Sequence, residues 1–183
     1  MTRLKVFVRL AVAILALIPA MAHAHAVVLP KNSAPGAYEK YVLRVPNEKG
    51  VPTTRVEIRF PSNIKVVSFS DVDGWTLEQI RDSSNAIIGA VWTGSLAPER
   101  FVEFPFVAVN PKETATLTWP VFQTYSDNER VAWTGPEGSE KPASSTAIAP
   151  AAPNGPGRLS LYLSIVAVLL SLMSLGLALR RTA

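Results

Sequence analysis

The sequence predicts an all-β domain, folded as an antiparallel β-sandwich, and one C-terminal transmembrane helix. Two observations predict the sandwich. Apolar and polar side chains alternate along short runs, and turn-forming residues separate these runs at intervals of roughly ten residues. A third observation predicts the helix, because 159–179 is apolar and carries no charge.

The N-terminal segment is expected to be a signal peptide over 1–24. Three basic residues precede an apolar run over 10–18, and small residues follow this run. That order is typical of secretory signal peptides, which a peptidase removes after an A-x-A site. Cleavage after Ala24 would make His25 the first residue of the mature protein.

The strands are expected within a domain over 25–138. The clearest alternation places Val56, Ile58 and Phe60 on one face and charged residues on the other. Similar runs occur at 41–45, 66–69, 87–93, 101–109, 114–119 and 131–134, separated by turn-forming stretches such as PNEKGVP, DVDG, NPKE and YSDNE. No Gly-rich turn leads into a helical pattern, which excludes Rossmann and P-loop domains.

The segment after the domain is expected to be a linker over 139–158, because its Pro, Ala and Ser content does not support a packed core. The apolar run 159–179 then has the length of a transmembrane helix, about 30 Å at about 1.5 Å per residue. Two arginines follow it, so the positive-inside rule predicts a cytoplasmic tail over 180–183. We therefore expect a single-pass type I protein of the cell membrane, with its domain on the periplasmic or extracellular side.

The composition excludes several functional classes. The net charge of +4 comes from the ends, since residues 25–157 carry 12 basic and 14 acidic side chains and have no basic surplus for nucleic acid. The absence of cysteine excludes disulfides and thiolate sites. The only histidines are His23 and His25, which leaves no central base for a catalytic triad. The pattern predicts a binding protein and not an enzyme.

A histidine at the mature N-terminus offers a metal chelate. Its amine and its imidazole Nδ1 close a ring on one ion, and these groups ordinarily titrate near about 7.7–8.0 and about 6.5, so a metal displaces both protons under mild conditions. Two nitrogens in a plane, completed by oxygen, suit tetragonal Cu(II) better than tetrahedral Zn(II). Cleavage after Ala22 would instead leave His23-Ala24-His25, with the histidine third, a flexible square-planar site for Cu(II) or Ni(II).

Several separated motifs resemble the YcnI-like family of exported copper-binding domains. They are the segment HAVVLPKNSAPGAYEKYVLRVPNEKGVPTTRVEIRFP, the pair Gly74-Trp75, FVEFPFVAVNP and QTYSDNERVAWTGPEG. The resemblance implies a cupredoxin-like or immunoglobulin-like sandwich that holds Cu(II) in a mono-histidine brace. It implies His25 as the brace, Glu78 as the acid ligand and Trp133 as the tryptophan beside the metal.

The acid ligand has a second candidate. Glu103 alternates with Phe101 and Val107, and a carboxylate on an apolar face is costly to bury unless it meets a cation or a metal. The alternative for Glu103 is an exposed or arginine-paired position. The other tryptophans, Trp75, Trp92 and Trp119, are expected in the core, and a core position is also the alternative for Trp133.

The expected function is that of a membrane-anchored, extracytoplasmic Cu(II)-binding protein, a copper chaperone or copper-acquisition factor. The implied partners are the copper ion, a membrane copper transporter or another metallochaperone, and the lipid bilayer around the C-terminal helix. A copper oxygenase is disfavoured because no second histidine remains after cleavage at Ala24. The alternative outside metal chemistry is an adhesion or carbohydrate-binding sandwich on a tether.

Overall fold

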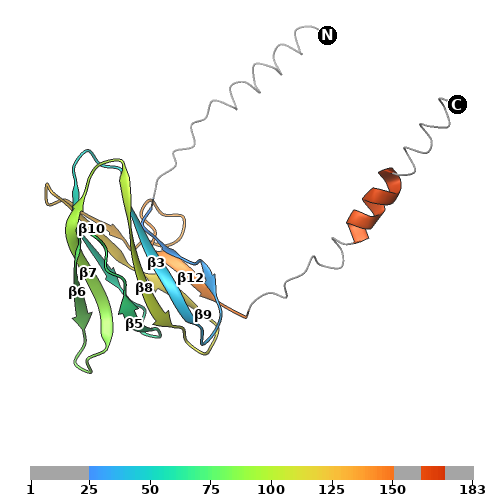
Figure 1. Cartoon of the computed structure of the whole chain (residues 1–183), viewed down its shortest axis with the longest axis horizontal. Coiled ribbons are helices and arrows are strands. Elements are labelled where there is room, and N and C mark those ends of the chain that lie inside the picture. The colour runs from blue at the N-terminus through green and yellow to red at the C-terminus, as the bar shows by residue number, and fades with distance from the viewer. Residues whose placement is uncertain (1–24, 151–161, 172–183) are drawn as a thin grey trace, which may run out of the picture. The chain divides into compact units, whose positions relative to one another are not determined.

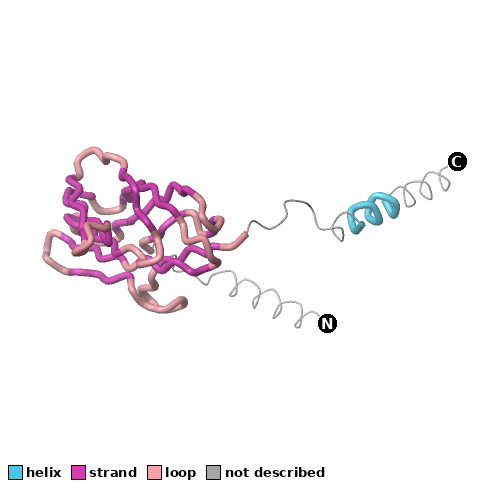
Figure 2. Tube along the Cα trace, turned by 90° about the horizontal axis from the view of Figure 1, so that it is seen from below, coloured by secondary structure: helices cyan, strands magenta, loops and turns pink. Residues whose placement is uncertain are grey.

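The computed structural model describes residues 25–150 and 162–171 (Figure 1). The chain divides into two compact units, of which the first ends at Ala149 and the second begins at Pro150. Figure 2 shows that the first unit is built of strands and loops, and that the described part of the second is a helix over 162–171. The expected signal peptide lies outside the described residues.

The first unit contains twelve strands within the described residues. In chain order they are β1 (Val27–Leu29), β2 (Asn32–Ser33), β3 (Tyr38–Asn47), β4 (Thr53–Arg59), β5 (Lys65–Phe69), β6 (Thr76–Arg81), β7 (Ile87–Leu96), β8 (Arg100–Val109), β9 (Ala115–Trp119), β10 (Val121–Tyr125), β11 (Arg130–Trp133) and β12 (Ser144–Ile148). The expected turns separate them, including those after β3, β5, β8 and β10.

The strands form three sheets. β1, β3, β8 and β5 make a four-stranded sheet in that order, and β11, β10, β4, β7 and β6 make a five-stranded one. A smaller sheet has the order β2, β12, β9. Neighbouring strands pair antiparallel except β2 and β12, which are parallel. The predicted antiparallel sandwich is therefore confirmed.

Aromatic side chains fill the core between the sheets. Trp92 stacks on Phe104 with 4.5 Å between ring centroids, and Tyr41 lies 5.0 Å from Trp119. Each large apolar side chain removed from water contributes about 1.5–3 kcal/mol. Trp92 and Trp119 are buried as predicted, and Trp75 packs against the core while partly exposed.

The alternation in β4 is observed with one difference. Val56 and Ile58 are fully buried in the core, as predicted. Glu57 belongs to the opposite, outward face, yet it is only 6% exposed because the side chains of Arg55 and Arg59 lie against it.

The expected linker is corrected at its beginning. β12 lies inside 139–158 and pairs along its whole length with β9 and at its end with β2, so the domain extends to Ala149. The sequence does not predict β12 as a strand, because most of its residues are small and polar. β12 alternates Ser144, Thr146 and Ile148 inward, and two of these bury hydroxyl groups in hydrogen bonds.

The expected transmembrane helix is described only in its middle part. Residues 162–171 are helical, whereas 159–161 and 172–179 lie outside the described residues, as does the expected tail over 180–183. Within the described part of the chain, no helix has both the length and the hydropathy needed to cross a membrane.

Candidate metal site at the start of the domain

His25 begins the described chain and lies against Trp133 of β11. The two rings meet edge to face, with 5.5 Å between centroids and an interplanar angle of 75°. The imidazole Nε2 lies 3.3 Å from the backbone carbonyl oxygen of Glu140. The fold therefore joins residue 25 to two positions that are more than 100 residues away along the chain.

The contact with Glu140 selects the tautomer of His25. A carbonyl oxygen only accepts hydrogen bonds, so Nε2 carries the proton and donates it, and a neutral ring then has its lone pair on Nδ1. Histidines that ligate metals commonly donate their other ring N–H to such a carbonyl, which fixes the ring's orientation. Nδ1 is also the nitrogen that closes a chelate ring with the residue's own amine.

A buried amide holds Trp133. Its indole Nε1–H donates to Oε1 of Gln123 at 3.3 Å, and Gln123 is fully buried. The Gln123 Nε2 group donates to the carbonyl of Pro46 and to the hydroxyl of Thr53, both at 2.8 Å. Because every polar atom of this amide is engaged, the indole ring that faces His25 is fixed by the core and not by the surface.

The loop over 134–143 presents the Glu140 carbonyl. Gly135 N–H donates to the Lys141 carbonyl at 2.9 Å, and Ala143 N–H donates to the Gly135 carbonyl at 2.8 Å, so the loop closes on itself. A Cβ on Gly135 would lie 3.0 Å from the Lys141 carbonyl oxygen and would meet the Ser139 hydroxyl. Glycine at 135 therefore permits the close approach that shapes this loop.

The strand β12 ties the N-terminal segment to the domain. The Ser144 hydroxyl accepts hydrogen bonds from Val28 N–H and from Lys31 Nζ, both at 2.8 Å. The Thr146 hydroxyl donates to the Pro30 carbonyl at 2.9 Å and accepts from the Trp119 indole. These contacts fix the chain just after His25, so β12 helps to position His25.

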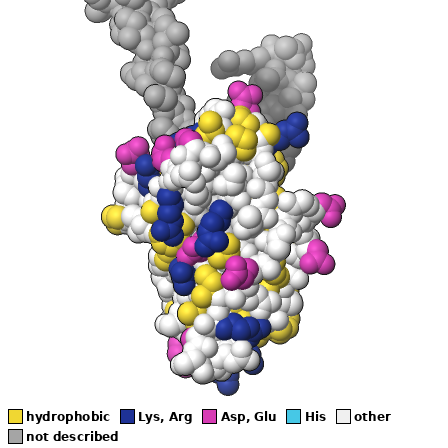
Figure 3. Space-filling view, turned by 90° about the vertical axis from the view of Figure 1, so that its left-hand side faces the viewer, with side chains coloured by type: hydrophobic (Ala, Val, Ile, Leu, Met, Phe, Trp, Pro, Cys, Tyr) yellow, Lys and Arg dark blue, Asp and Glu magenta, His cyan; other side chains and the backbone are white. Residues whose placement is uncertain are grey.

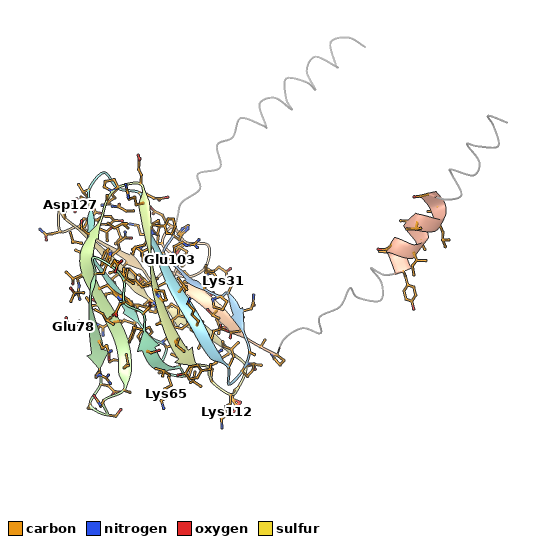
Figure 4. The ribbon with its side chains drawn as sticks, viewed as in Figure 1. Lys31, Lys65, Glu78, Glu103, Lys112 and Asp127 are labelled. Carbon is orange, nitrogen blue, oxygen red and sulfur yellow. The ribbon has the colours of Figure 1, made fainter. Side chains whose placement is uncertain are left out.

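The structure does not bring Glu78 to His25 and Trp133. Glu78 is exposed on β6 (Figure 4), which is one edge of the five-stranded sheet. Trp133 belongs to β11, which is the other edge of that sheet. Four strand spacings separate these edges, about 19 Å at about 4.8 Å each. In this structure Glu78 therefore does not lie beside His25 and Trp133.

Glu103 is paired with an arginine. Its Oε1 accepts hydrogen bonds from Arg44 Nη2 at 2.8 Å and Arg44 Nε at 2.9 Å, on the outer face of the four-stranded sheet. The inward side chains of β8 are Phe104, Phe106 and Ala108, so the assignment of Glu103 to an apolar face is corrected. The arginine-paired alternative is the one observed.

Other acids lie nearer to Trp133. A cavity of about 180 Å³ borders Trp133 and is lined by Glu48, Glu129 and Glu140. Within it, Glu129 forms an ion pair with Lys49. These three acids carry no sequence motif. Each of them lies in or beside a loop next to β3, β10 or β11. Only the strand order of the folded domain shows that these loops lie near Trp133.

The same cavity contains a phenol that stays protonated. Burial, followed by the negative charges of Glu129, Glu48 and Asp127, raises the pKa of Tyr125 to about 12. The Tyr125 hydroxyl therefore provides no phenolate ligand near neutral pH.

Within residues 25–150 and 162–171, no three His, Asp or Glu side chains gather into a metal site. A terminal brace takes two nitrogens from a single residue and does not need such a cluster.

The comparisons with known proteins place this domain in a family. A family model described as a domain of unknown function, DUF1775, matches residues 25–153. The chain belongs to the DUF1775 family. The match begins at His25 and includes β12, in agreement with the corrected boundary of the domain.

One relative of this DUF1775 domain is the copper-binding protein CutI of Bacillus subtilis (strain 168). The two are 34% identical over 131 residues, which is 70% of this chain and 64% of CutI. The chain therefore matches somewhat less than two thirds of that relative's length. The resemblance to the YcnI-like copper-binding family is confirmed.

A solved structure supports the fold of the DUF1775 domain. An uncharacterised protein from Nocardia farcinica, whose crystal structure has an immunoglobulin-like fold, is 28% identical with a TM-score of 0.60. The alignment covers 69% of this chain and 99% of that one. Of the two sandwich types that the sequence left open, this likeness supports the immunoglobulin-like one.

Proposed function

We propose that this protein binds Cu(II) as cargo at a mono-histidine brace formed by His25, outside the cytoplasmic membrane to which its C-terminal segment anchors it. The observation that carries the proposal is the seating of His25 against Trp133, with Nε2 directed to the Glu140 carbonyl. This arrangement orients Nδ1 for chelation together with the amine that cleavage after Ala24 would create. The copper-binding relative supports the choice of metal.

The oxygen ligand comes, in this proposal, from the acids on the Trp133 side of the domain. Glu140 belongs to the loop that contacts His25, and Glu48 and Glu129 line the cavity beside Trp133. Glu129 would have to give up its ion pair with Lys49 to act as a ligand. Glu140 is favoured by its contact with the histidine.

An open site of this kind suits transfer. An amine, an imidazole and one carboxylate leave positions on tetragonal Cu(II) that a receiving protein can occupy. We therefore propose a copper chaperone or copper-acquisition factor whose partner is a membrane transporter or another metallochaperone, and not an enzyme.

The first experiment compares copper retention by mature wild type and His25→Ala in equilibrium dialysis against Cu(II). The wild type is expected to retain one ion per chain and the variant none. A third sample carries one additional methionine before His25. It should bind much more weakly, because its amine no longer belongs to the histidine. Equal retention in wild type and His25→Ala would refute the brace, and retention by neither would favour the non-metal adhesion module.

The second experiment locates the oxygen ligand. Glu140→Gln, Glu48→Gln and Glu129→Gln are titrated with Cu(II), while Glu78→Gln and Glu103→Gln serve as matched controls on distant strands. One of the first three is expected to weaken binding at least tenfold and to change the Cu(II) electron paramagnetic resonance spectrum. If Glu78→Gln alone did so, the assignment to the Trp133 side would fail.

The third experiment determines the mature N-terminus by mass spectrometry of the exported protein. A chain beginning at His25 supports the brace, whereas one beginning at His23 supports the flexible site with histidine in third position. Any other start, or a blocked amine, contradicts both.

A further inference from the structure

Three arginines surround one buried glutamate on the outer face of the five-stranded sheet. Arg55 Nη2 lies 2.9 Å from Oε2 of Glu57, and Arg59 Nη2 lies 2.7 Å from Oε1. Arg130 Nη2 approaches Oε2 from β11 at 3.7 Å. We call these three arginines, grouped around Glu57, the arginine surface.

The register explains why the three side chains meet. On β4, residues 55, 57 and 59 all point outward. Across β10, Arg55 pairs with Thr124, which in turn pairs with Arg130 of β11. Phe122 lies beside Glu57 in the next row, and the Arg130 guanidinium lies 4.1 Å from the centroid of its ring. The surface thus combines three guanidinium groups with an aromatic ring.

The arginine surface has a positive charge that the rest of the domain does not share. The Glu57 carboxylate offsets one of the three guanidinium charges, so the group has a net charge of +2, while residues 25–150 carry 12 basic and 14 acidic side chains. The arginine side chains are 42%, 46% and 53% exposed. Figure 3 shows basic side chains gathered around acidic atoms on this side of the domain.

Glu57 pairs with the arginines and leaves some of their N–H hydrogen-bond donors available. Each guanidinium group has five N–H donors in a planar fork, and the contacts to Glu57 engage only some of them. The three side chains remain partly exposed while Glu57 pairs with all of them and Phe122 packs against Arg130. Such prearranged forks recognise carboxylates bidentately at reduced entropic cost.

The surface and the candidate copper site share strands β10 and β11 but lie on opposite faces of the five-stranded sheet. On β10, Phe122 faces outward beneath Arg130, and its neighbour Gln123 faces inward to Trp133. On β11, Arg130 and Trp133 stand at opposite ends of one four-residue strand. The last strand of the domain, β12, belongs to a different sheet from the arginines.

We propose that the arginine surface docks a partner protein through a carboxylate-rich segment, whose Asp and Glu side chains pair with Arg55, Arg59 and Arg130. That this partner exchanges copper rests on the proposed function, whereas the docking itself does not. A glutamate-rich segment fits the positive charge and the guanidinium groups of this surface. Val91 of β7 pairs with Glu57 on one side and with Glu78 of β6 on the other. The negative charge of Glu78 therefore limits the positive surface to β4, β10 and β11.

The test uses poly-L-glutamate as the probe and metal-free mature protein, with binding followed by calorimetry at low and at physiological salt. Arg130→Gln is the principal variant, because Arg130 is the most exposed of the three and removing it spares the closer pairs with Glu57. It should weaken binding about threefold, in line with about 0.2–1 kcal/mol for an exposed charge pair. Arg55→Gln combined with Arg130→Gln should abolish it.

The matched control is Arg44→Gln. Arg44 is also paired with a glutamate and lies beside a phenylalanine ring, but it is on the four-stranded sheet and its pair has no net charge. Its removal should leave probe binding unchanged. The proposal would be overturned if the wild type did not bind poly-L-glutamate, or if the Arg55 and Arg130 variants bound it as tightly as the wild type.

Two further arms separate the possible outcomes. Vesicles of phosphatidylglycerol and phosphatidylcholine test a lipid surface, and arginine-dependent binding to these vesicles without binding to poly-L-glutamate would also overturn the proposal. His25→Ala should bind the probe like wild type. A failure of the copper site is thereby distinguished from a failure of the docking surface.

Discussion

Gln123 connects the core to the candidate site through a single side chain. Its amide nitrogen donates to Pro46 and Thr53, and its oxygen accepts from the indole that packs against His25. A buried amide is costly unless all its hydrogen bonds are made, and here the fold makes them. The orientation of Trp133 therefore depends on residues that do not touch His25.

The change Gln123→Leu is expected to lower the free energy of unfolding by about 2–4 kcal/mol, because it leaves a carbonyl, a hydroxyl and an indole N–H without partners. Urea unfolding of the metal-free domain measures this. Thr124→Ala, on the outward face of the same strand, should cost less than about 1 kcal/mol. An equal cost for both changes would show that the Gln123 network does not stabilise the domain.

Glu57 predicts a pH dependence of stability. Burial acts to raise the pKa of its carboxyl, but hydrogen bonds from Arg55 and Arg59 and their charges hold that pKa below its usual value. A depressed folded-state pKa stabilises the protein above the unfolded value of about 4.3, and this stabilisation is lost as the pH falls through the folded value.

Glu57→Gln should therefore lower the free energy of unfolding by about 1–3 kcal/mol at pH 7, and the difference from wild type should shrink below about pH 4. Denaturant unfolding at several pH values measures it. Glu103→Gln, from the half-exposed pair with Arg44, should cost at most about 1 kcal/mol. If the difference in unfolding free energy between wild type and Glu57→Gln stayed constant down to pH 2.5, a lowered pKa of Glu57 in the folded state would be contradicted.

At the scale of elements, β12 has the largest effect on the site. It pairs with β9 over five residues and bonds the N-terminal segment through Ser144 and Thr146. It also directly follows the loop over 134–143, whose Glu140 carbonyl contacts the His25 ring. One short strand of small residues thus links the first and last parts of the domain.

A chain spanning 25–138 is therefore expected to lose cooperative unfolding, because it exposes β9 and leaves the Trp119 indole N–H without its Thr146 partner. A chain spanning 25–150 should retain a single sharp transition in circular dichroism on heating. Equal melting temperatures for the two chains would show that β12 is dispensable.

At the scale of the whole molecule, the proposal requires a domain held at a membrane. The apolar run 159–179 follows the domain after a short segment. A chain that ends at residue 158 should be exported and found in the soluble fraction, whereas the full chain should remain with the membrane through alkaline carbonate washing. A full chain released by that wash would contradict the anchor.

Much of the fold was predictable from the sequence because it depends on neighbouring residues. Alternation in β4 and the burial of Trp92 and Trp119 follow from local patterns of period two. β6, β10 and β12 lie outside the predicted runs, since β6 is a largely exposed edge strand, β10 buries Gln123, and β12 buries hydroxyl groups. Hydrophobic periodicity does not detect strands whose inward residues are polar.

The sequence by itself determined that this is an all-β domain with a histidine at its expected mature start, because strand period and cleavage sites are properties of contiguous residues. Only the tertiary structure decided what surrounds that histidine. Trp133 and the Glu140 carbonyl reach it from more than 100 residues away, while Glu78 is placed at the opposite sheet edge. Strand order decides such neighbours, and strand order depends on pairings that no local pattern encodes.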